Sequence, residues 1–180
     1  MSDRAFTIRW VLGTALGATA VLLITAAVGS RLPADYAATR TACFQQSPEV
    51  LWHLLSDPEA GPGWRTDLQR IERAANASGH ACWREVYRDG RTLTLETIES
   101  APPRRLVRRV CDPDGFVTGR WCADLAPSGD GCRLTLTERG RVSNPFARLA
   151  FRLLVDPAES LDSYLQMAGN RLGERPAIVR

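Results

Sequence analysis

The chain has 180 residues, of which 44% are hydrophobic and 24% are charged, a composition typical of one folded domain with an appendage. All 23 basic residues are arginine, so chemistry that needs a lysine amine, such as Schiff-base formation, is excluded. Residues 1–31 carry three of these arginines and one of the 20 acidic residues, which leaves 20 arginines against 19 acids in the rest of the chain. Because a nearly neutral domain lacks the basic excess of a nucleic-acid binder, we expect no nucleic-acid partner.

Residues 10–30 read WVLGTALGATAVLLITAAVGS and form a hydrophobic segment with no charged side chain. At about 1.5 Å per helical residue, the segment is long enough to cross a hydrocarbon core about 30 Å thick. Arg9 and Arg31 flank the segment, as is typical of a helix whose ends meet water. We therefore predict a tail of residues 1–9, a transmembrane helix of residues 10–30 and a linker of residues 31–35.

Two other interpretations of this segment stay open. A cleaved signal peptide fits the small residues at 27–29, although the apolar run is longer than is usual for such peptides. A buried core helix fits less well, because apolar residues surround the whole helix and a proline-containing linker follows it. The charges on the two sides of the segment slightly favour a single-pass membrane protein whose domain lies outside the cytoplasm.

After the linker, the pattern changes to short strands and helices. Residues 36–44 predict a strand, and Ser47-Pro48-Glu49 supplies a cap, a first-turn proline and a first-turn acid for a helix that ends near Asp57. Recurrent turn signals then separate six predicted strands, at residues 68–74, 82–87, 92–99, 106–111, 119–125 and 132–142. This order indicates an antiparallel meander.

The C-terminal part of the chain predicts helix. Residues 146–154 and 161–172 each carry apolar side chains at helical spacing. Pro157 lies between them, so the pattern fits either one long kinked helix or two abutting helices. One face of the predicted sheet must be covered, and this helical region is the element that can cover it. Alternation along two strands directs four side chains to the covered face: Trp121, Leu125, Leu134 and Leu136.

Five segments carry a family resemblance: SPEVLWHLLSDPEAGPGW, WREVYRDG, ESAPPRRLVRRV, GRWCADLAPSGDGCRLTLTERGRVSNP and SLDSYLQMAGNRLGE. Over residues 36–174 the chain resembles the polyketide cyclase/dehydrase and lipid-transport family of the START-like (Bet v 1-like, SRPBCC) superfamily. The resemblance implies a helix-grip α+β fold, in which a curved antiparallel sheet of about seven strands wraps a long C-terminal helix. This START-like domain would cover residues 36–175 and leave a C-terminal tail of residues 176–180.

The same resemblance implies a function. Family members hold lipids, polyketides, steroids or quinones in an apolar cavity between sheet and helix, and a minority catalyse cyclisation or dehydration. Versions with an N-terminal membrane span occur, and this chain is similar to them. Pro157 is a departure, since chains typical of the family run the last helix without a proline.

Few residues have the pattern of a catalytic or metal site. His53 lies on the first predicted helix and His80 beside a polar turn, so both are expected at the surface. Five cysteines, at positions 43, 82, 111, 122 and 132, include no CxxC pair, and we expect neither a zinc site nor another cofactor. Cys111 and Cys122 fall on neighbouring predicted strands, where a disulfide is conceivable outside the cytoplasm; otherwise they are buried thiols.

Glu138 is the one weak candidate for catalysis. By alternation it shares a strand face with Leu134 and Leu136, and an isolated carboxyl group there would have a raised pKa suited to acid–base chemistry. The competing interpretation, which we favour, is that Glu138 reaches solvent or pairs with Arg108 or Arg109.

Large side chains suited to an apolar pocket are Trp64, Trp83, Trp121, Phe151 and Tyr164, although they could equally fill the core. From the wider apolar set we predict five ligand-binding residues: Trp121, Leu136, Phe151, Leu153 and Tyr164. The favoured function is non-catalytic binding of a hydrophobic small molecule or lipid beside a membrane. Two alternatives remain, an enzyme that acts on a polyketide-like precursor and a membrane-tethered interaction module without a ligand.

Overall fold

The structure, a computed structural model, describes residues 2–75, 81–111 and 117–179, without the side chains of residues 2–15 and 111. The chain divides into two compact units. One unit, here called the helical unit, combines residues 1–34 with residues 142–155. The other, the sheet unit, combines residues 35–141 with residues 156–180. Residues 142–155, which the sequence placed inside the predicted domain of residues 36–175, therefore cluster with the N-terminal helix.

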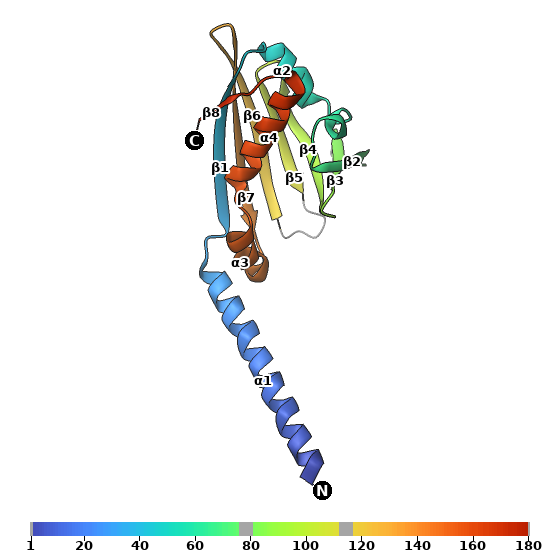
Figure 1. Ribbon diagram of the computed structural model, residues 1–180, viewed down its shortest axis with the longest axis vertical. Helices are drawn as coiled ribbons and strands as arrows, with labels where there is room; N and C mark the ends of the chain where they lie inside the picture. Colours follow the sequence, from blue (N-terminus) through green and yellow to red (C-terminus); the bar gives the residue numbers. More distant parts are fainter. Residues whose placement is uncertain (1, 76–80, 112–116, 180) are drawn as a thin grey trace. The chain divides into compact units, whose positions relative to one another are not determined.

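The described strands of the chain form one eight-stranded sheet in the order β2-β3-β4-β5-β6-β7-β1-β8 (Figure 1). The pairs β1–β7, β1–β8, β2–β3, β3–β4, β4–β5 and β5–β6 are antiparallel. The strand bounds are β1 Asp35–Phe44, β2 Leu68–Arg73, β3 Cys82–Tyr87, β4 Thr92–Ala101, β5 Arg105–Cys111, β6 Val117–Ser128, β7 Gly131–Val142 and β8 Ala177–Val179. The large antiparallel sheet with helices confirms the predicted α+β class.

Local turn chemistry and long-range pairing both shape the sheet. The turn between β3 and β4 contains Gly90 at φ 88°, a conformation that glycine adopts without steric cost. At the far side of the sheet, β1 pairs with β7 and places Tyr36 opposite Gly140. A Cβ atom on Gly140 would lie 2.5 Å from the Tyr36 ring, so the close approach of this ring requires glycine.

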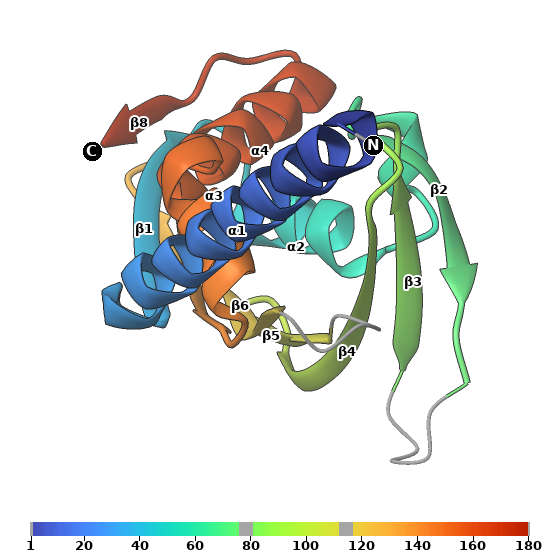
Figure 2. The same cartoon turned by 90° about the horizontal axis from the view of Figure 1, so that it is seen from below.

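Two helices of the sheet unit pack inside the curve of the sheet. Figure 2 shows the strands curving around α2, Pro48–Ser56, and α4, Pro157–Leu172. A 3-10 turn, η1, follows α2 at Gly61–Gly63. Ser47 caps α2 and Asp156 caps α4 by accepting hydrogen bonds from backbone N–H groups, and α2 begins at the residues that the sequence indicated.

The core lies between α4, α2 and the inner face of the sheet. Leu161, Leu165 and Ala168 of α4 are buried against sheet residues that include Leu134 and Leu136. Burying one leucine side chain contributes roughly 1.5–3 kcal/mol, so this contact is a main source of the stability of the sheet unit. Trp121, Leu125, Leu134 and Leu136 all belong to or pack on this core, which confirms the predicted face.

The helical unit consists of α1, Ser2–Arg31, and α3, Pro145–Leu154. The two helices approach closely at Gly29, where an added Cβ atom would lie 2.1 Å from the carbonyl oxygen of Pro145. Arg148 of α3 donates hydrogen bonds to the carbonyl oxygens of Gly29 (3.2 Å) and Leu32 (3.1 Å). A cation at the C-terminal end of a helix is favourable, because the helix dipole is negative there. Arg148 therefore ties α3 to the end of α1.

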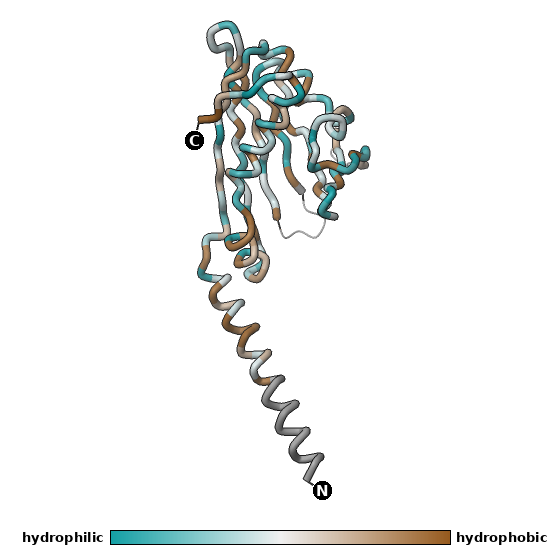
Figure 3. The backbone as a smooth tube through the Cα atoms, viewed as in Figure 1, coloured by the Kyte–Doolittle hydropathy of each residue, from teal (hydrophilic) through white to brown (hydrophobic). Residues whose placement is uncertain are grey.

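The predicted transmembrane helix of residues 10–30 falls within α1, and its side chains up to residue 15 lie outside the described part of the chain. Hydrophobic residues colour much of the remaining α1 brown in Figure 3, and several are exposed: Leu16, Val21, Leu22, Leu23, Ile24 and Val28. Among the residues that the structure describes, no helix is long and apolar enough to cross a membrane.

The structure decides between the two alternatives left open for the C-terminal region and corrects the prediction for the last residues. The C-terminal region forms two helices, because Val155 and Asp156 are extended in front of Pro157. Proline lacks the N–H that would continue the helix and disfavours helical geometry in the residue before it. The predicted tail of residues 176–180 contains β8, which pairs with β1, so the described sheet has eight strands rather than about seven. The predicted turns at 76–79 and 112–115 lie outside the described residues.

Candidate functional site

Three aromatic side chains meet under α4 and form what we call the aromatic cluster: Trp64, Trp121 and Tyr164. The ring of Tyr164, on α4, lies edge-on to Trp64 at 5.3 Å and to Trp121 at 5.4 Å between ring centroids. Trp64 follows η1, and Trp121 lies on the inner face of β6 next to the buried Ala123. Burial raises the pKa of the Tyr164 hydroxyl, so this group stays protonated at neutral pH. The cluster therefore combines apolar ring surface with neutral hydrogen-bonding groups.

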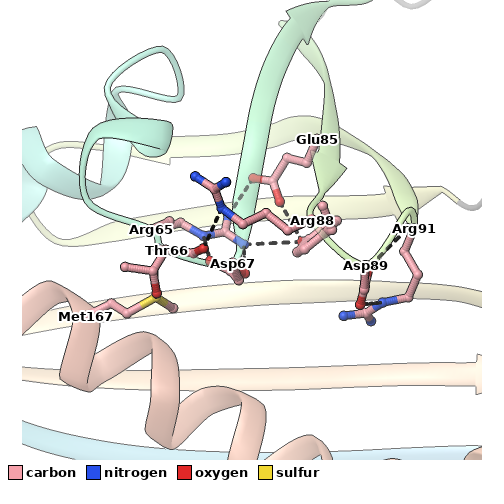
Figure 4. Close-up of polar contacts among 9 residues, drawn as sticks. Arg65, Thr66, Asp67, Glu85, Arg88, Asp89, Arg91 and Met167 are labelled. Carbon is pink, nitrogen blue, oxygen red and sulfur yellow. Dashed lines mark hydrogen bonds and ion pairs between the residues drawn. The ribbon is translucent and has the colours of Figure 1, made fainter.

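A buried ion pair borders the aromatic cluster. Arg65, which follows Trp64, donates to Oε1 of Glu85 at 2.7 Å and to Oδ2 of Asp67 at 2.9 Å (Figure 4). The Tyr87 hydroxyl donates to the other Glu85 oxygen, Oε2, at 2.6 Å. Arg65 is 8% exposed and Glu85 2% exposed, and the Arg65 guanidinium lies 5.3 Å from the Tyr164 ring centroid. Both oxygens of Glu85 are thus occupied, and the single charge of Arg65 faces two carboxylates within this group.

Arg108 lies on the inner face of β5, opposite Trp121 of β6, and is 6% exposed. Its Nη2 donates to the carbonyl oxygen of Leu55, in the last turn of α2, at 2.9 Å, and its guanidinium lies 5.9 Å from the Trp121 ring centroid. Burial lowers the pKa of Arg108 from its ordinary value, but an arginine remains charged in a protein. Arg108 is therefore a buried cation beside the aromatic cluster.

Two buried donors at this site have no acceptor among the described residues: Nε of Arg108 and Nε1 of Trp64. Buried polar groups in proteins are hydrogen-bonded in the large majority of cases, and leaving one unpaired costs about 1–3 kcal/mol. Two such donors on one aromatic cluster are therefore unusual. They give this part of the sheet unit unused hydrogen-bonding capacity.

The predicted ligand-binding residues divide between the two units. Trp121, Leu136 and Tyr164 belong to the sheet unit, where Leu136 is fully buried in the core and the other two form part of the aromatic cluster. Phe151 and Leu153 lie on α3 in the helical unit, where Leu153 is 73% exposed. As ligand contacts, all five stay predictions.

The sequence-based site omitted the residue with the most unusual environment. Arg108 alternates with Leu106 and Val110 on β5, so a charged side chain on an otherwise apolar strand face was a signal available in the sequence. Trp64 was recognised as suited to a pocket but was not chosen. Its position beside Tyr164 depends on the path of the chain after η1, which local periodicity does not reveal.

Glu138, the weak catalytic candidate, has a partner of its own. Its Oε1 accepts a hydrogen bond from the Tyr36 hydroxyl at 2.7 Å. Burial raises the pKa of Glu138, and the hydrogen bond from Tyr36 opposes that shift. The predicted pairing with Arg108 or Arg109 is wrong, because both arginines lie on β5 and β6 separates that strand from β7. A catalytic role for Glu138 stays a prediction.

Of the two alternatives left open for Cys111 and Cys122, the strand register excludes the disulfide. Cys122 is a free thiol, and the strand register places it opposite Val107, while Cys111 lies opposite Thr118. Four residues along a strand correspond to about 13 Å, which is beyond the reach of a disulfide. His53 is exposed, as expected, and His80 lies outside the described residues. In the described part of the chain, no three histidine, cysteine or acidic side chains gather as a metal site would require.

A separate open depression of about 890 Å³ lies elsewhere on the sheet unit. It is lined mainly by polar residues such as Arg120, Asp124 and Arg139. Arg120 and Asp124 alternate along β6 with Trp121 and Ala123, so their side chains leave the sheet on its outer face. No residue of the aromatic cluster lines this depression.

Comparison with known proteins identifies the family. The sequence profile described as polyketide cyclase / dehydrase and lipid transport matches residues 37–161, so the chain belongs to this family. The family to which the sequence was found to be similar is thereby confirmed. No curated protein sequence matches the chain.

Several solved structures share the fold at low sequence identity. A conserved protein from Geobacillus kaustophilus is 17% identical with a TM-score of 0.63, over 81% of this chain and 100% of that one. Truncated norcoclaurine synthase from Thalictrum flavum is 11% identical with a TM-score of 0.61, over 78% of this chain and 95% of that one. The Zhui aromatase/cyclase from a Streptomyces species is 15% identical with a TM-score of 0.59, over 77% of this chain and 96% of that one. At these identities the likeness establishes the fold alone.

The buried ion pair generates a stability prediction. Glu85→Gln removes a charge from the buried Arg65 group and is expected to lower the free energy of unfolding by about 3 kcal/mol. Glu72→Gln is the matched control, since it removes the partner of Arg70 from an exposed ion pair of 2.7 Å and should cost at most about 1 kcal/mol. Urea unfolding of the full chain, followed by tryptophan fluorescence, measures both values. Equal small losses would contradict a buried, tightly coupled pair.

Proposed function

We propose that the sheet unit binds a hydrophobic small molecule at the aromatic cluster, on the inner face of the sheet beside α4. The observation that carries the proposal is the pair of buried donors without a described acceptor, Nε of Arg108 and Nε1 of Trp64, beside aromatic rings. Binding sites for small molecules typically combine apolar walls with a few well-placed polar groups. Membership in a lipid-transport and cyclase family supports the same class of ligand.

Binding without turnover is the form of this function that we favour. The acidic groups next to the aromatic cluster are engaged, because Glu85 accepts from Arg65 and Tyr87 while Asp67 accepts from Arg65. The oxygens of these two carboxylates are therefore already used as hydrogen-bond acceptors within the protein. The alternatives of an enzyme for polyketide-like precursors and of an interaction module have no comparable observation in their support.

The ligand proposal predicts saturable binding of a neutral apolar probe. Phenylnaphthylamine should bind the purified full chain, and Trp121→Ala should weaken that binding about tenfold, which corresponds to about 1.4 kcal/mol of lost ring contact. The control is Trp83→Ala, which removes a buried tryptophan of β3 that lies outside the core cluster under α4. Titration with fluorescence detection measures the affinities. Absence of saturable binding, or equal effects of the two substitutions, would contradict the proposal.

We also propose that residues 10–30 hold the chain at a membrane. The support comes from the sequence, in which 21 consecutive residues lack charge between Arg9 and Arg31. A tether would keep a domain that accepts an apolar molecule close to a lipid phase in which such a molecule dissolves. The location of the domain outside the cytoplasm is part of this proposal and rests on the slight charge difference across the segment.

Membrane attachment predicts that the chain stays in the membrane pellet after an alkaline wash of cell fractions. Charged residues within a membrane segment cost roughly 2.5–3.5 kcal/mol each, so the double variant Leu22→Arg/Leu23→Arg should move much of the chain to the supernatant. Val179→Arg, at an exposed position of β8, serves as the control and should leave the distribution unchanged. Recovery of the unaltered chain in the supernatant would contradict the attachment.

A further inference from the structure

Arg108 is a buried cation without a direct counter-ion. Among the described residues, no carboxylate forms an ion pair with it, and its hydrogen bond from Nη2 goes to a neutral carbonyl group, that of Leu55. Burying an arginine without a charged partner costs several kcal/mol of hydration free energy. A protein that keeps such a group on an otherwise apolar strand face, between Leu106 and Val110, carries a cost that binding of an anion would offset.

The neighbouring carboxylates make their hydrogen bonds elsewhere, although the charge of Glu85 acts on Arg108 through space and partly opposes the lowering of the Arg108 pKa by burial. Both oxygens of Glu85 accept hydrogen bonds, from Arg65 and from Tyr87. Both oxygens of Asp67 accept from Arg65, at 3.4 and 2.9 Å. Arg65 therefore donates directly to two acids, whereas the hydrogen bond of Arg108 goes to a neutral carbonyl oxygen.

The contact with α2 uses only part of the hydrogen-bonding capacity of Arg108. A guanidinium beneath the last turn of a helix gains from the partial negative charge at that end, an effect of up to about 2 kcal/mol in buried geometries. That contact uses Nη2 alone, and Nε remains without an acceptor. A guanidinium can donate five hydrogen bonds, so Arg108 retains capacity for an acidic group of a ligand.

We infer that the molecule bound at the aromatic cluster is an apolar anion, such as one with a carboxylate head, and that Arg108 binds its charged oxygen. Trp64 Nε1 supplies a second donor on the same cluster, and the rings of Trp121 and Tyr164 contact the apolar body. This inference rests on the proposed function and adds the charge of the ligand and the residue that recognises it. Hydrogen bonds between charged partners are the strong ones, so the anion is also the source of selectivity.

Two probes with the same aromatic scaffold separate the inference from the proposed function. Anilinonaphthalene sulfonate carries an anionic group that phenylnaphthylamine lacks. The full chain should bind the sulfonate at least about tenfold more tightly than the neutral probe, a difference of about 1.4 kcal/mol. Equal affinities, or tighter binding of the neutral probe, would overturn the inference and leave the proposed function standing. Failure of both probes to bind would overturn the proposed function itself.

The variants Arg108→Gln and Arg109→Gln form a matched pair. They change adjacent residues of β5, but Arg109 pairs with Glu96 at 3.3 Å, and its side chain is about half exposed. Arg108→Gln should abolish the preference for the sulfonate and keep the affinity for phenylnaphthylamine within about twofold, while Arg109→Gln should keep the preference. If Arg108→Gln kept the preference for the sulfonate, the role of Arg108 would be limited to its hydrogen bond with α2, and the inference would be overturned. The comparison of the two probes on the unaltered chain tests the inference even if Arg108→Gln fails to fold.

Discussion

The packing of α4 on the inner face of the sheet is the contact on which the rest of the sheet unit depends. Leu161, Leu165 and Ala168 bury the apolar stripe of the helix, and this burial holds Tyr164 between Trp64 and Trp121. The aromatic cluster forms only because α4 packs there, since Trp64 follows η1, Trp121 lies on β6 and Tyr164 lies on α4. The same seating excludes water from the two arginines beside the rings, and the low polarity of that environment makes the difference between a paired and an unpaired charge large.

The two buried arginines show how one environment can serve stability and binding at once. Arg65 is matched by Glu85 and Asp67, so its burial is compensated within the protein. Arg108 has the carbonyl group of Leu55 as its hydrogen-bond acceptor and forms a direct ion pair with no described acid. A protein interior built only for stability would favour an apolar side chain at such a position, because replacing buried charge by well-packed apolar groups is often stabilising. Retention of the guanidinium is the physical reason to look for a ligand at this place.

Features set by neighbouring residues could be predicted from the sequence, whereas features set by distant residues could not. Ser47 and Asp156 cap α2 and α4 through contacts within one turn, and alternation placed Trp121 and Leu136 on the inner face. The three residues of β8 have no pattern of their own and form a strand because β1 offers an edge. The partners of charged side chains could not be predicted either. Glu138 accepts a hydrogen bond from Tyr36, which is 102 positions away in the chain. The lack of a direct ion-pair partner for Arg108 depends on which groups the nearby acids contact. The sequence therefore predicted two residues of the aromatic cluster, Trp121 and Tyr164, but not the buried arginines beside it, Arg65 and Arg108.

The proposed contact between Arg108 and the charged group of an apolar ligand can be tested directly. Heteronuclear NMR of arginine side chains observes this contact at the Nε–H group, the donor that has no acceptor among the described residues. On addition of anilinonaphthalene sulfonate to the full chain, the Nε–H resonance of Arg108 should shift in step with occupancy, while that of the exposed Arg109 stays in place. An unchanged Arg108 resonance at saturating probe would contradict the claim.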